Sequence, residues 1–400
     1  MFARKSVRQT YAPSERVLNL MNDYRHMTNT AIRIGLQNDA SSLKKLSMLS
    51  YKELKRFNIP SYYKLCAISK AAGILASRKK SIKRGFPSRD PYVKKPVLVS
   101  CYGFKITKRN LEIPIENRNY ESIPLNIHLM KTLEDKSLEV RSFTLTANSL
   151  SLCVAKEVPE NTEIDSVIGV DRNLENIAVG NSSKVSYYWT SKIVRIGETT
   201  KDIVRSFKRN DFRIRRQVAS KYGKRKKNRI QNVLNQISND VVLSCSSQNQ
   251  AITFEDIRYI RSMYRKGNHQ GKNHRRKMNN HWPFAEIKRQ IEYKAQWLGI
   301  PVIHLTKSET RGTSSNCYIC GERLQSSREK QRQLWCKKCE KWFDRDLVAV
   351  MNISRKGWVR FAHSKGIGNE AMVQEPEKTI VILKVDPMKL PTIKRVLGGL

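Results

Sequence analysis

Acidic residues are scarce in this chain of 400 residues: 35 Asp and Glu stand against 76 Lys and Arg, which gives a formal net charge of +41. Such an excess makes a compact protein repel itself unless a polyanion neutralises the charge. We expect nucleic acid as the partner, because each phosphate that a lysine or arginine neutralises releases condensed counterions. A basic surface without a ligand is the alternative.

Long apolar runs are also missing. No stretch approaches the roughly 18 consecutive apolar residues that indicate a membrane-spanning helix. The first residues, "MFARKSVRQTYAPS", lack the apolar core of a secretion signal. We therefore expect no membrane attachment, and a cytoplasmic protein that is associated with the nucleoid when it binds DNA.

Cysteines are few, and half of them are scattered singly, which is typical of small buried side chains in a reducing compartment. The other half form two CxxC pairs separated by fifteen residues: Cys317, Cys320, Cys336 and Cys339. This spacing predicts a zinc ribbon, in which four thiolates hold one Zn²⁺. Because protein ligands fill all four positions, we expect a structural site. Chance placement or a redox pair is the alternative.

The periodicity of apolar residues changes several times along the chain, from helical to alternating and back. It favours an α/β fold together with a small antiparallel β-barrel. The predicted domains are a barrel (1–13 and 90–160), an inserted helical lobe (14–89), an alternating α/β domain (161–310 and 343–365), a zinc ribbon (311–342) and a C-terminal tail (366–400). We leave it undecided whether the tail folds, although it contains "TIVILKV".

Two segments concentrate the basic charge. Residues 205–229 hold twelve Lys or Arg and a single acid, and we expect them on a helical hairpin that turns at "KYGKRKKNR". A solvated helix face usually alternates its signs, so this imbalance favours phosphate contact. Residues 258–277 hold no acid at all. The residues that we predict to contact nucleic acid are Lys224, Arg225, Lys226, Lys227, Arg229, Arg261, Arg265, Arg275 and Arg276. Stacking on bases or a place in the core are both open for Tyr259, Tyr264 and Trp282.

Three acids stand where a buried side chain is expected. Asp171 ends the apolar strand "VIGV", and Glu255 ends "AITF". Asp346 begins a predicted helical stripe that continues through Val350, Ile353 and Gly357 and should face a sheet. A carboxylate on such a face is costly unless a positive group meets it. Asp344, by contrast, is placed to cap that helix.

The three acids together form the set that two divalent ions, about 3.5 to 4 Å apart, require for phosphodiester hydrolysis. Carboxylate oxygens are the ligands that Mg²⁺ and Mn²⁺ prefer. Taken singly, each acid could instead be a strand-end cap or one half of an ion pair.

Five segments, in this order and spacing, resemble the TnpB family of transposon-associated RNA-guided nucleases, which are related to type V CRISPR effectors and to the eukaryotic Fanzor proteins. They are "IGVDRNLENIAVG", "ITFEDIRYI", "WPFAEIKRQIEYKA", "TSSNCYICG" and "CKKCEKWFDRDLVAVMNI". The resemblance implies a RuvC/RNase H-like nuclease domain with an inserted zinc ribbon, preceded by a wedge-like barrel that carries a helical recognition lobe. It assigns Asp171, Glu255 and Asp346 to the nuclease triad. The chain departs from the family at Val348, where an Asn is common, and at "DRN", where Asp-Leu-Gly is usual.

The resemblance implies a magnesium-dependent DNA endonuclease. Its guide RNA would read the target DNA by base pairing while the protein holds the nucleic-acid backbone. A monomer is favoured. One alternative is an RNA-guided or plain DNA-binding protein that does not cleave, whose expected mark is a lost acid; all three are present. Another is a recombination or transposition protein that uses the nuclease fold without a guide.

Overall fold

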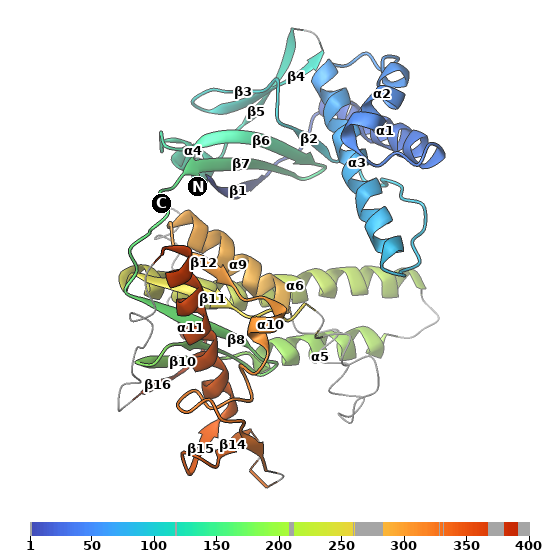
Figure 1. Ribbon diagram of the computed structural model, residues 1–400. Helices are drawn as coiled ribbons and strands as arrows, with labels where there is room; N and C mark the ends of the chain where they lie inside the picture. Colours follow the sequence, from blue (N-terminus) through green and yellow to red (C-terminus); the bar gives the residue numbers. More distant parts are fainter. Residues whose placement is uncertain are drawn as a thin grey trace. The chain divides into compact units, whose positions relative to one another are not determined.

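The computed structural model describes residues 2–116, 118–207, 212–258, 260, 283–327, 329–330, 332–366 and 380–390 (Figure 1). These residues divide between two compact units, an N-terminal unit, Phe2–Glu157, and a C-terminal unit that begins at Val158. Each unit has its own buried core, so each is described by itself.

The strands of the N-terminal unit pair antiparallel in two sheets. The first sheet has the order β1 (Phe2–Thr10), β7 (Ser149–Glu157), β6 (Glu139–Thr146) and β2 (Leu98–Ser100). The second has the order β3 (Lys105–Ile106), β4 (Asn110–Glu116) and β5 (Asn119–Pro124), and the short helix α4 (Ile127–Leu133) follows it. The pairing of the described strands does not join the two sheets into one closed barrel, so the barrel stays a prediction.

Three helices accompany these sheets: α1 (Glu15–Gln37), α2 (Leu43–Leu54) and α3 (Ser61–Lys83). Ser14 caps α1 by accepting a hydrogen bond from the Val17 amide at 3.3 Å. Tyr63 on α3 is fully buried, and its hydroxyl donates to the Pro114 carbonyl at 3.0 Å. This bond ties the helices to β4.

A six-stranded mixed sheet organises the C-terminal unit. Its order is β12 (Val302–His304), β11 (Gln250–Phe254), β8 (Ser166–Arg172), β9 (Asn176–Gly180), β10 (Lys184–Trp189) and β16 (Val381–Val385). The meander β8–β9–β10 is antiparallel, whereas β11 runs parallel to both β8 and β12. Strand β16 pairs in parallel with β10, so the segment that the sequence left undecided contributes one strand.

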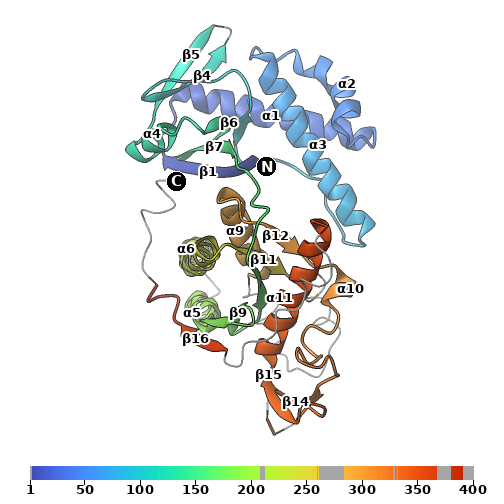
Figure 2. The ribbon, with the colours of Figure 1, turned by 60° about the vertical axis from the view of Figure 1, so that its left-hand side comes forward.

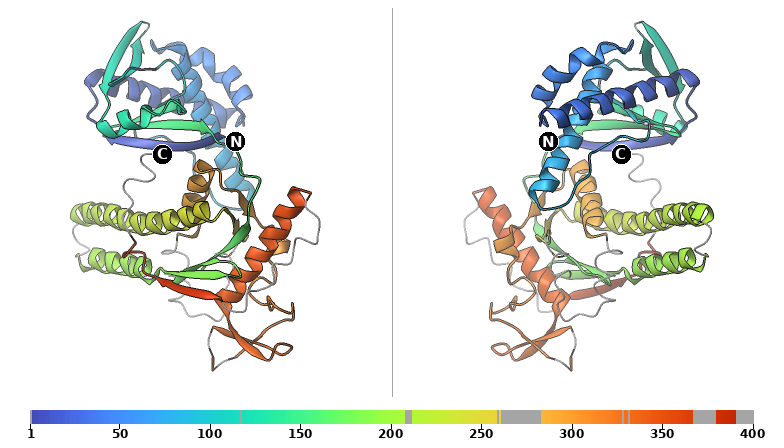
Figure 3. Two further views of the ribbon diagram at one scale, coloured as in Figure 1. Left: turned by 90° about the vertical axis from the view of Figure 1, so that its left-hand side faces the viewer. Right: turned by 90° about the vertical axis from the view of Figure 1, so that its right-hand side faces the viewer.

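Helices cover both faces of this sheet (Figures 2 and 3). Apolar side chains of α6 (Phe212–Ser247) and α9 (Phe284–Trp297) form a core with Ile168, Val170 and Phe254, while α11 (Arg345–Ser364) packs on the opposite face. Helix α5 (Ser191–Ser206) lies beside α6, and the short α10 (Lys307–Thr310) follows β12.

The predicted turn at "KYGKRKKNR" was wrong. Helix α6 runs through it without interruption, and Gly223 lies in mid-helix. One glycine disfavours a helix interior by only about 1 kcal/mol, and no proline accompanies it, so the buried apolar stripe that follows it, from Ile230 to Cys245, outweighs it.

A buried lysine joins α6 to α9. Lys294 Nζ donates to the carbonyl and the side-chain oxygen of Asn235, at 3.1 and 2.7 Å, and to Ser238 Oγ at 2.6 Å. Burial lowers the pKa of Lys294 to about 7. Since its ordinary value is near 10.4, the folded protein loses this proton at a lower pH than the unfolded chain does.

This difference predicts a pH-dependent stability. Between pH 7 and pH 10 the unfolded chain binds more protons, so the free energy of unfolding of the wild type should rise with pH by up to about 1.4 kcal/mol per unit. Lys294→Met removes this contribution. Denaturant titrations of both proteins at pH 7, 8 and 9 should therefore give a difference, wild type minus variant, that grows with pH. A constant difference would contradict the role given to Lys294.

Candidate functional site

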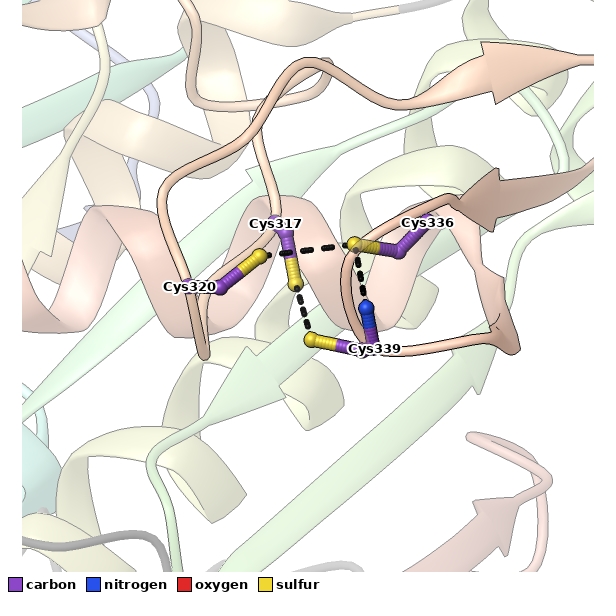
Figure 4. Close-up of side chains that lie close together, drawn as sticks. All are labelled: Cys317, Cys320, Cys336 and Cys339. Carbon is purple, nitrogen blue, oxygen red and sulfur yellow. Dashed lines mark hydrogen bonds between the residues drawn. The ribbon is translucent and has the colours of Figure 1, made fainter.

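Four sulfur atoms meet where the chain enters β15 (Lys341–Asp344), the strand that precedes α11 (Figure 4). Cys317 and Cys320 lie in one loop, and Cys336 and Cys339 lie at the turn between β14 (Gln333–Cys336) and β15. A third strand, β13 (Gln325–Ser326), completes this small sheet. The Sγ atoms of Cys317 and Cys339 are 3.8 Å apart, and those of Cys320 and Cys336 are 3.4 Å apart.

This arrangement fits a zinc ion. Tetrahedral coordination with Zn–S bonds of about 2.3 Å places neighbouring sulfurs about 3.8 Å apart. All four Sγ atoms lie within 4.8 Å of one another. Gly321 has a φ of +77°, a conformation that few other residues adopt and that the turn after the first pair requires. The backbone N–H of Glu322 lowers the pKa of Cys320 to about 7, which favours the thiolate that zinc binds.

Two of the predicted acids lie side by side at one edge of the large sheet. Strands β8 and β11 are parallel, and Phe254 pairs with Val170. An acid follows each member of this pair: Asp171 follows Val170 within β8, and Glu255 follows Phe254 just after the end of β11. The two acids are therefore at the same level of the sheet. Side chains alternate along a strand, so Asp171 shares the face of Gly169, which lies against α11.

Helix α11 brings the third acid to this edge. Asp344 caps the helix, as predicted, by accepting hydrogen bonds from the amides of Asp346 and Leu347, each at 3.0 Å. The predicted stripe does face the sheet. A Cβ added to Gly169 would lie 2.4 Å from the Val350 carbonyl oxygen, and one added to Gly357 would lie 2.0 Å from Thr253 Oγ1. At Gly169 the main chain of α11 therefore touches the strand directly, and at Gly357 it touches the Thr253 side chain.

The charges of Glu255 and Asp346 act on Asp171. Asp171 is 7% exposed, and its pKa is raised well above the ordinary value, first by burial and then by the charges of Glu255 and Asp346. Burial also raises the pKa of Glu255, while the charge of Arg172 opposes this rise. Asp346 is 3% exposed. A buried group of carboxylates with these properties favours a bound cation.

Three further side chains hold the acids. Asn173 Nδ2 donates to Asp171 Oδ2 at 2.6 Å, and Asn176 Nδ2 donates to Asp346 Oδ2 at 2.9 Å. Arg332, from the ribbon, forms an ion pair with the same oxygen of Asp346. No sequence pattern had pointed to these three residues. The two asparagines stand within five positions of Asp171, which was the available signal, whereas nothing distinguished Arg332 from its polar neighbours.

The acids fit divalent ions by their chemistry, because hard oxygen donors suit Mg²⁺ and Mn²⁺. The carboxylate oxygens of the three acids are farther apart than the cysteine sulfurs. In the part of the chain that the structure describes, the cysteines form the one cluster of three or more His, Cys, Asp or Glu side chains whose ligand atoms are close enough together to hold an ion. Arg332 and Asn176 both donate to Asp346 Oδ2, so they hold one of the two oxygens that this carboxylate offers to an ion.

The predicted nucleic-acid contacts are partly described. Arg225 and the neighbouring lysines and arginine lie on α6: Lys224, Lys226, Lys227 and Arg229. All are exposed except Lys226, which is half-buried. The remaining predicted residues, Arg261, Arg265, Arg275 and Arg276, lie outside the described residues, as do Tyr259, Tyr264 and Trp282. Within the described ranges, none of the helices combines the length and the apolarity that crossing a membrane demands.

Known proteins are similar to this chain in sequence and in fold. A family model described as "Cas12f1-like, TNB domain" matches residues 284–353, a span that includes the four cysteines and Asp346. The TnpB-like protein MJ0751 of Methanocaldococcus jannaschii is 30% identical over 211 residues, which cover 50% of this chain and 72% of that protein. The fold is similar to that of a chain in the cryo-EM structure of a Cas12f1–sgRNA–target DNA complex, with a TM-score of 0.58 and 13% identity, over 85% of this chain and 82% of the other.

Proposed function

This chain belongs to the TnpB family of proteins, and from that premise we propose that it is an RNA-guided DNA endonuclease associated with a transposon. The observation that carries the proposal is the convergence of Asp171, Glu255 and Asp346 at one edge of the large sheet, where the charges of Glu255 and Asp346 raise the pKa of Asp171. A buried carboxylate whose pKa is raised by neighbouring acids is typical of functional sites. A protein that only bound nucleic acid would have no use for them.

The three acids would hold two Mg²⁺ or Mn²⁺ ions. Such ions, when bound, activate a water molecule and stabilise the leaving oxygen of a phosphodiester. Asp171 is the central acid, because the charges of both others act on it. Asn173 holds one of its oxygens, and Asn176 holds one oxygen of Asp346, so both carboxylates are oriented before an ion arrives. The four cysteines would hold zinc and fix the chain just before Asp344 and Asp346.

The partners would be a guide RNA and a target DNA. The Cas12f1 relative is named for a complex with both kinds of molecule. The net charge of +41 and the exposed basic residues of α6 supply the phosphate contacts that such a complex requires. Base pairing would select the target, and the protein would recognise the shape and charge of the paired strands.

The domains would follow the family's plan. Residues 161–310 and 343–365 would form the RuvC-like nuclease domain, with residues 311–342 inserted as its zinc ribbon. Residues 1–13 and 90–160 would form the wedge-like barrel, and residues 14–89 the recognition lobe. The six-stranded mixed sheet, with helices on both faces, supports the first assignment.

Purification without nuclease treatment tests the proposal. The protein should retain a discrete RNA species, and sequencing of that RNA gives its guide segment. With magnesium, the complex should cut a DNA duplex that matches the guide and leave a mismatched duplex intact. Retained RNA and target binding without any cutting would favour the DNA-binding alternative. The absence of bound RNA, with cutting intact, would favour a nuclease that works without a guide.

A further inference from the structure

Arg172 is a buried cation directly beneath the acids. It follows Asp171 on β8, so the two side chains point to opposite faces of the sheet. Arg172 is 4% exposed, and its guanidinium carbon lies 5.4 Å from the centre of the Phe254 ring. Its neighbours on this face of β8, Ile168 and Val170, belong to the apolar core. A charged side chain here is therefore unexpected.

Its direct hydrogen bonds go to two main-chain carbonyls. One terminal nitrogen donates to the Glu255 oxygen at 3.0 Å, and the other donates to the Phe284 oxygen at 3.2 Å. The Nε atom is buried and has no hydrogen-bond partner among the described residues. The two carbonyls are 29 positions apart in the sequence. One planar guanidinium thus joins the end of β11 to the start of α9.

The burial of this charged side chain is energetically unfavourable. Burial lowers the pKa of Arg172, and the charges of Glu255 and Asp171 oppose this effect. A buried cation without a bonded carboxylate is usually less favourable than an apolar side chain of the same volume. A leucine or methionine would extend the core at this position at lower cost, so the stability of the fold does not explain the arginine.

The position of Glu255 does explain it. Strand β11 ends at Phe254, whose pairing with Val170 is the last in that ladder. Glu255 lies one residue beyond the ladder, so the sheet no longer holds its carbonyl. Arg172 supplies the missing hydrogen bond from within the neighbouring strand, next to Asp171. One side chain therefore links the main chains of two of the three acids.

We propose that Arg172 is a positioning residue that holds the main chain at Glu255 and thereby sets the distance of this carboxylate from Asp171. The inference rests on the proposed function, because it concerns the acids that would bind the ions. The planar fork of an arginine can donate to both carbonyls at once, whereas a lysine carries its charge at one atom. The two-donor geometry of the guanidinium, and not its charge alone, holds the main chain at Glu255.

Mn²⁺ binding tests this inference independently of cutting. Electron paramagnetic resonance of the full-length, RNA-free protein measures free Mn²⁺, and Asp171→Asn defines the background of other sites. Arg172→Lys and Arg172→Met should each weaken the site by about tenfold or more, as the loss of groups that orient metal ligands usually does. Lys294→Met is the matched control, since it removes another buried basic side chain of the same unit, one that is bonded to Asn235 and Ser238 instead of to the acids; its Mn²⁺ affinity should equal that of the wild type.

The outcomes separate the two proposals. Wild-type affinity in Arg172→Lys would overturn the inference alone, because the charge would then suffice. A loss of binding that merely follows the fraction of unfolded protein, measured by circular dichroism, would also overturn it. If the wild type holds no Mn²⁺ that Asp171→Asn abolishes, the acid site itself fails, and the proposed function fails with it.

Discussion

Asp171→Asn is expected to lower the cutting of matched DNA by on the order of 10³-fold or more, because it removes the charge that the other two acids surround. Retention of RNA should stay close to that of the wild type, since no hydrogen bond or ion pair among the described residues links Asp171 to the basic surface of α6. Single-turnover cleavage at saturating magnesium measures the first effect, and the yield of copurified RNA measures the second.

The same substitution should stabilise the metal-free protein. Folding raises the pKa of Asp171, so the wild type is destabilised as the pH rises above the unfolded value, near 3.9, towards the higher folded one. An asparagine has no charge to bury and can still accept the hydrogen bond of Asn173. A higher melting temperature at pH 7 without metal, together with lost cutting, is the combined signature of a functional acid.

Asp39→Asn is the control for both measurements, because this carboxylate is exposed and pairs only with Lys79 at 3.1 Å among the described contacts. It should change neither cutting nor the melting temperature appreciably. Cutting by Asp171→Asn at the wild-type rate would show that Asp171 does not bind the catalytic metal ions. A lower melting temperature would show that the acid supports the fold.

Cys336→Ser is expected to remove the zinc and to unfold the ribbon. Cys336 is fully buried beside Leu334 and Phe343 in a cluster too small to be stable by itself. Structural zinc supplies about 10–16 kcal/mol to isolated zinc-finger peptides, so its loss should leave residues 311–342 without a stable fold. Metal analysis should show one zinc fewer per chain, and limited proteolysis should cut within the ribbon.

Cutting should also fall in this variant, by about 10- to 100-fold, because the ribbon leads into Asp344 and Asp346 and orients them from outside. Cys101→Ser is the matched control; this cysteine is exposed and lies in the N-terminal unit, so zinc content and cutting should not change. Full activity in a zinc-free Cys336→Ser protein would separate the ribbon from catalysis.

The sequence was most informative where the signal is local. The CxxC spacing, the cap at Asp344 and the stripe through Gly357 each depend on residues within a few turns of one another, and the structure has the cap and the stripe as predicted. The acids Asp171 and Glu255 stood out because a charge ended each apolar strand. The family resemblance followed from these same segments, and the relatives confirm it.

Contacts between distant segments could not be predicted in this way. Asn176 and Asp346 are 170 positions apart, and no periodicity relates them. Arg332 stands in a polar stretch in which several basic residues were equally placed to reach an acid. Helix α6 shows the converse error, since a glycine that usually ends a helix is overruled when the helix continues into a long apolar stripe that packs on the core, from Ile230 to Cys245.

Gly169 and Gly357, which lie between α11 and the sheet, set how closely the helix packs on the sheet. At most helix–sheet interfaces, interlocking side chains form a layer that can rearrange when one of them changes. At Gly169 that layer is missing and the main chain of α11 lies against the strand, while at Gly357 the helix lies against the Thr253 side chain. The height of Asp346 above the sheet therefore depends on these two close approaches, and a methyl group added at Gly169, or at Gly357 eleven residues after Asp346, would push this carboxylate away from the sheet.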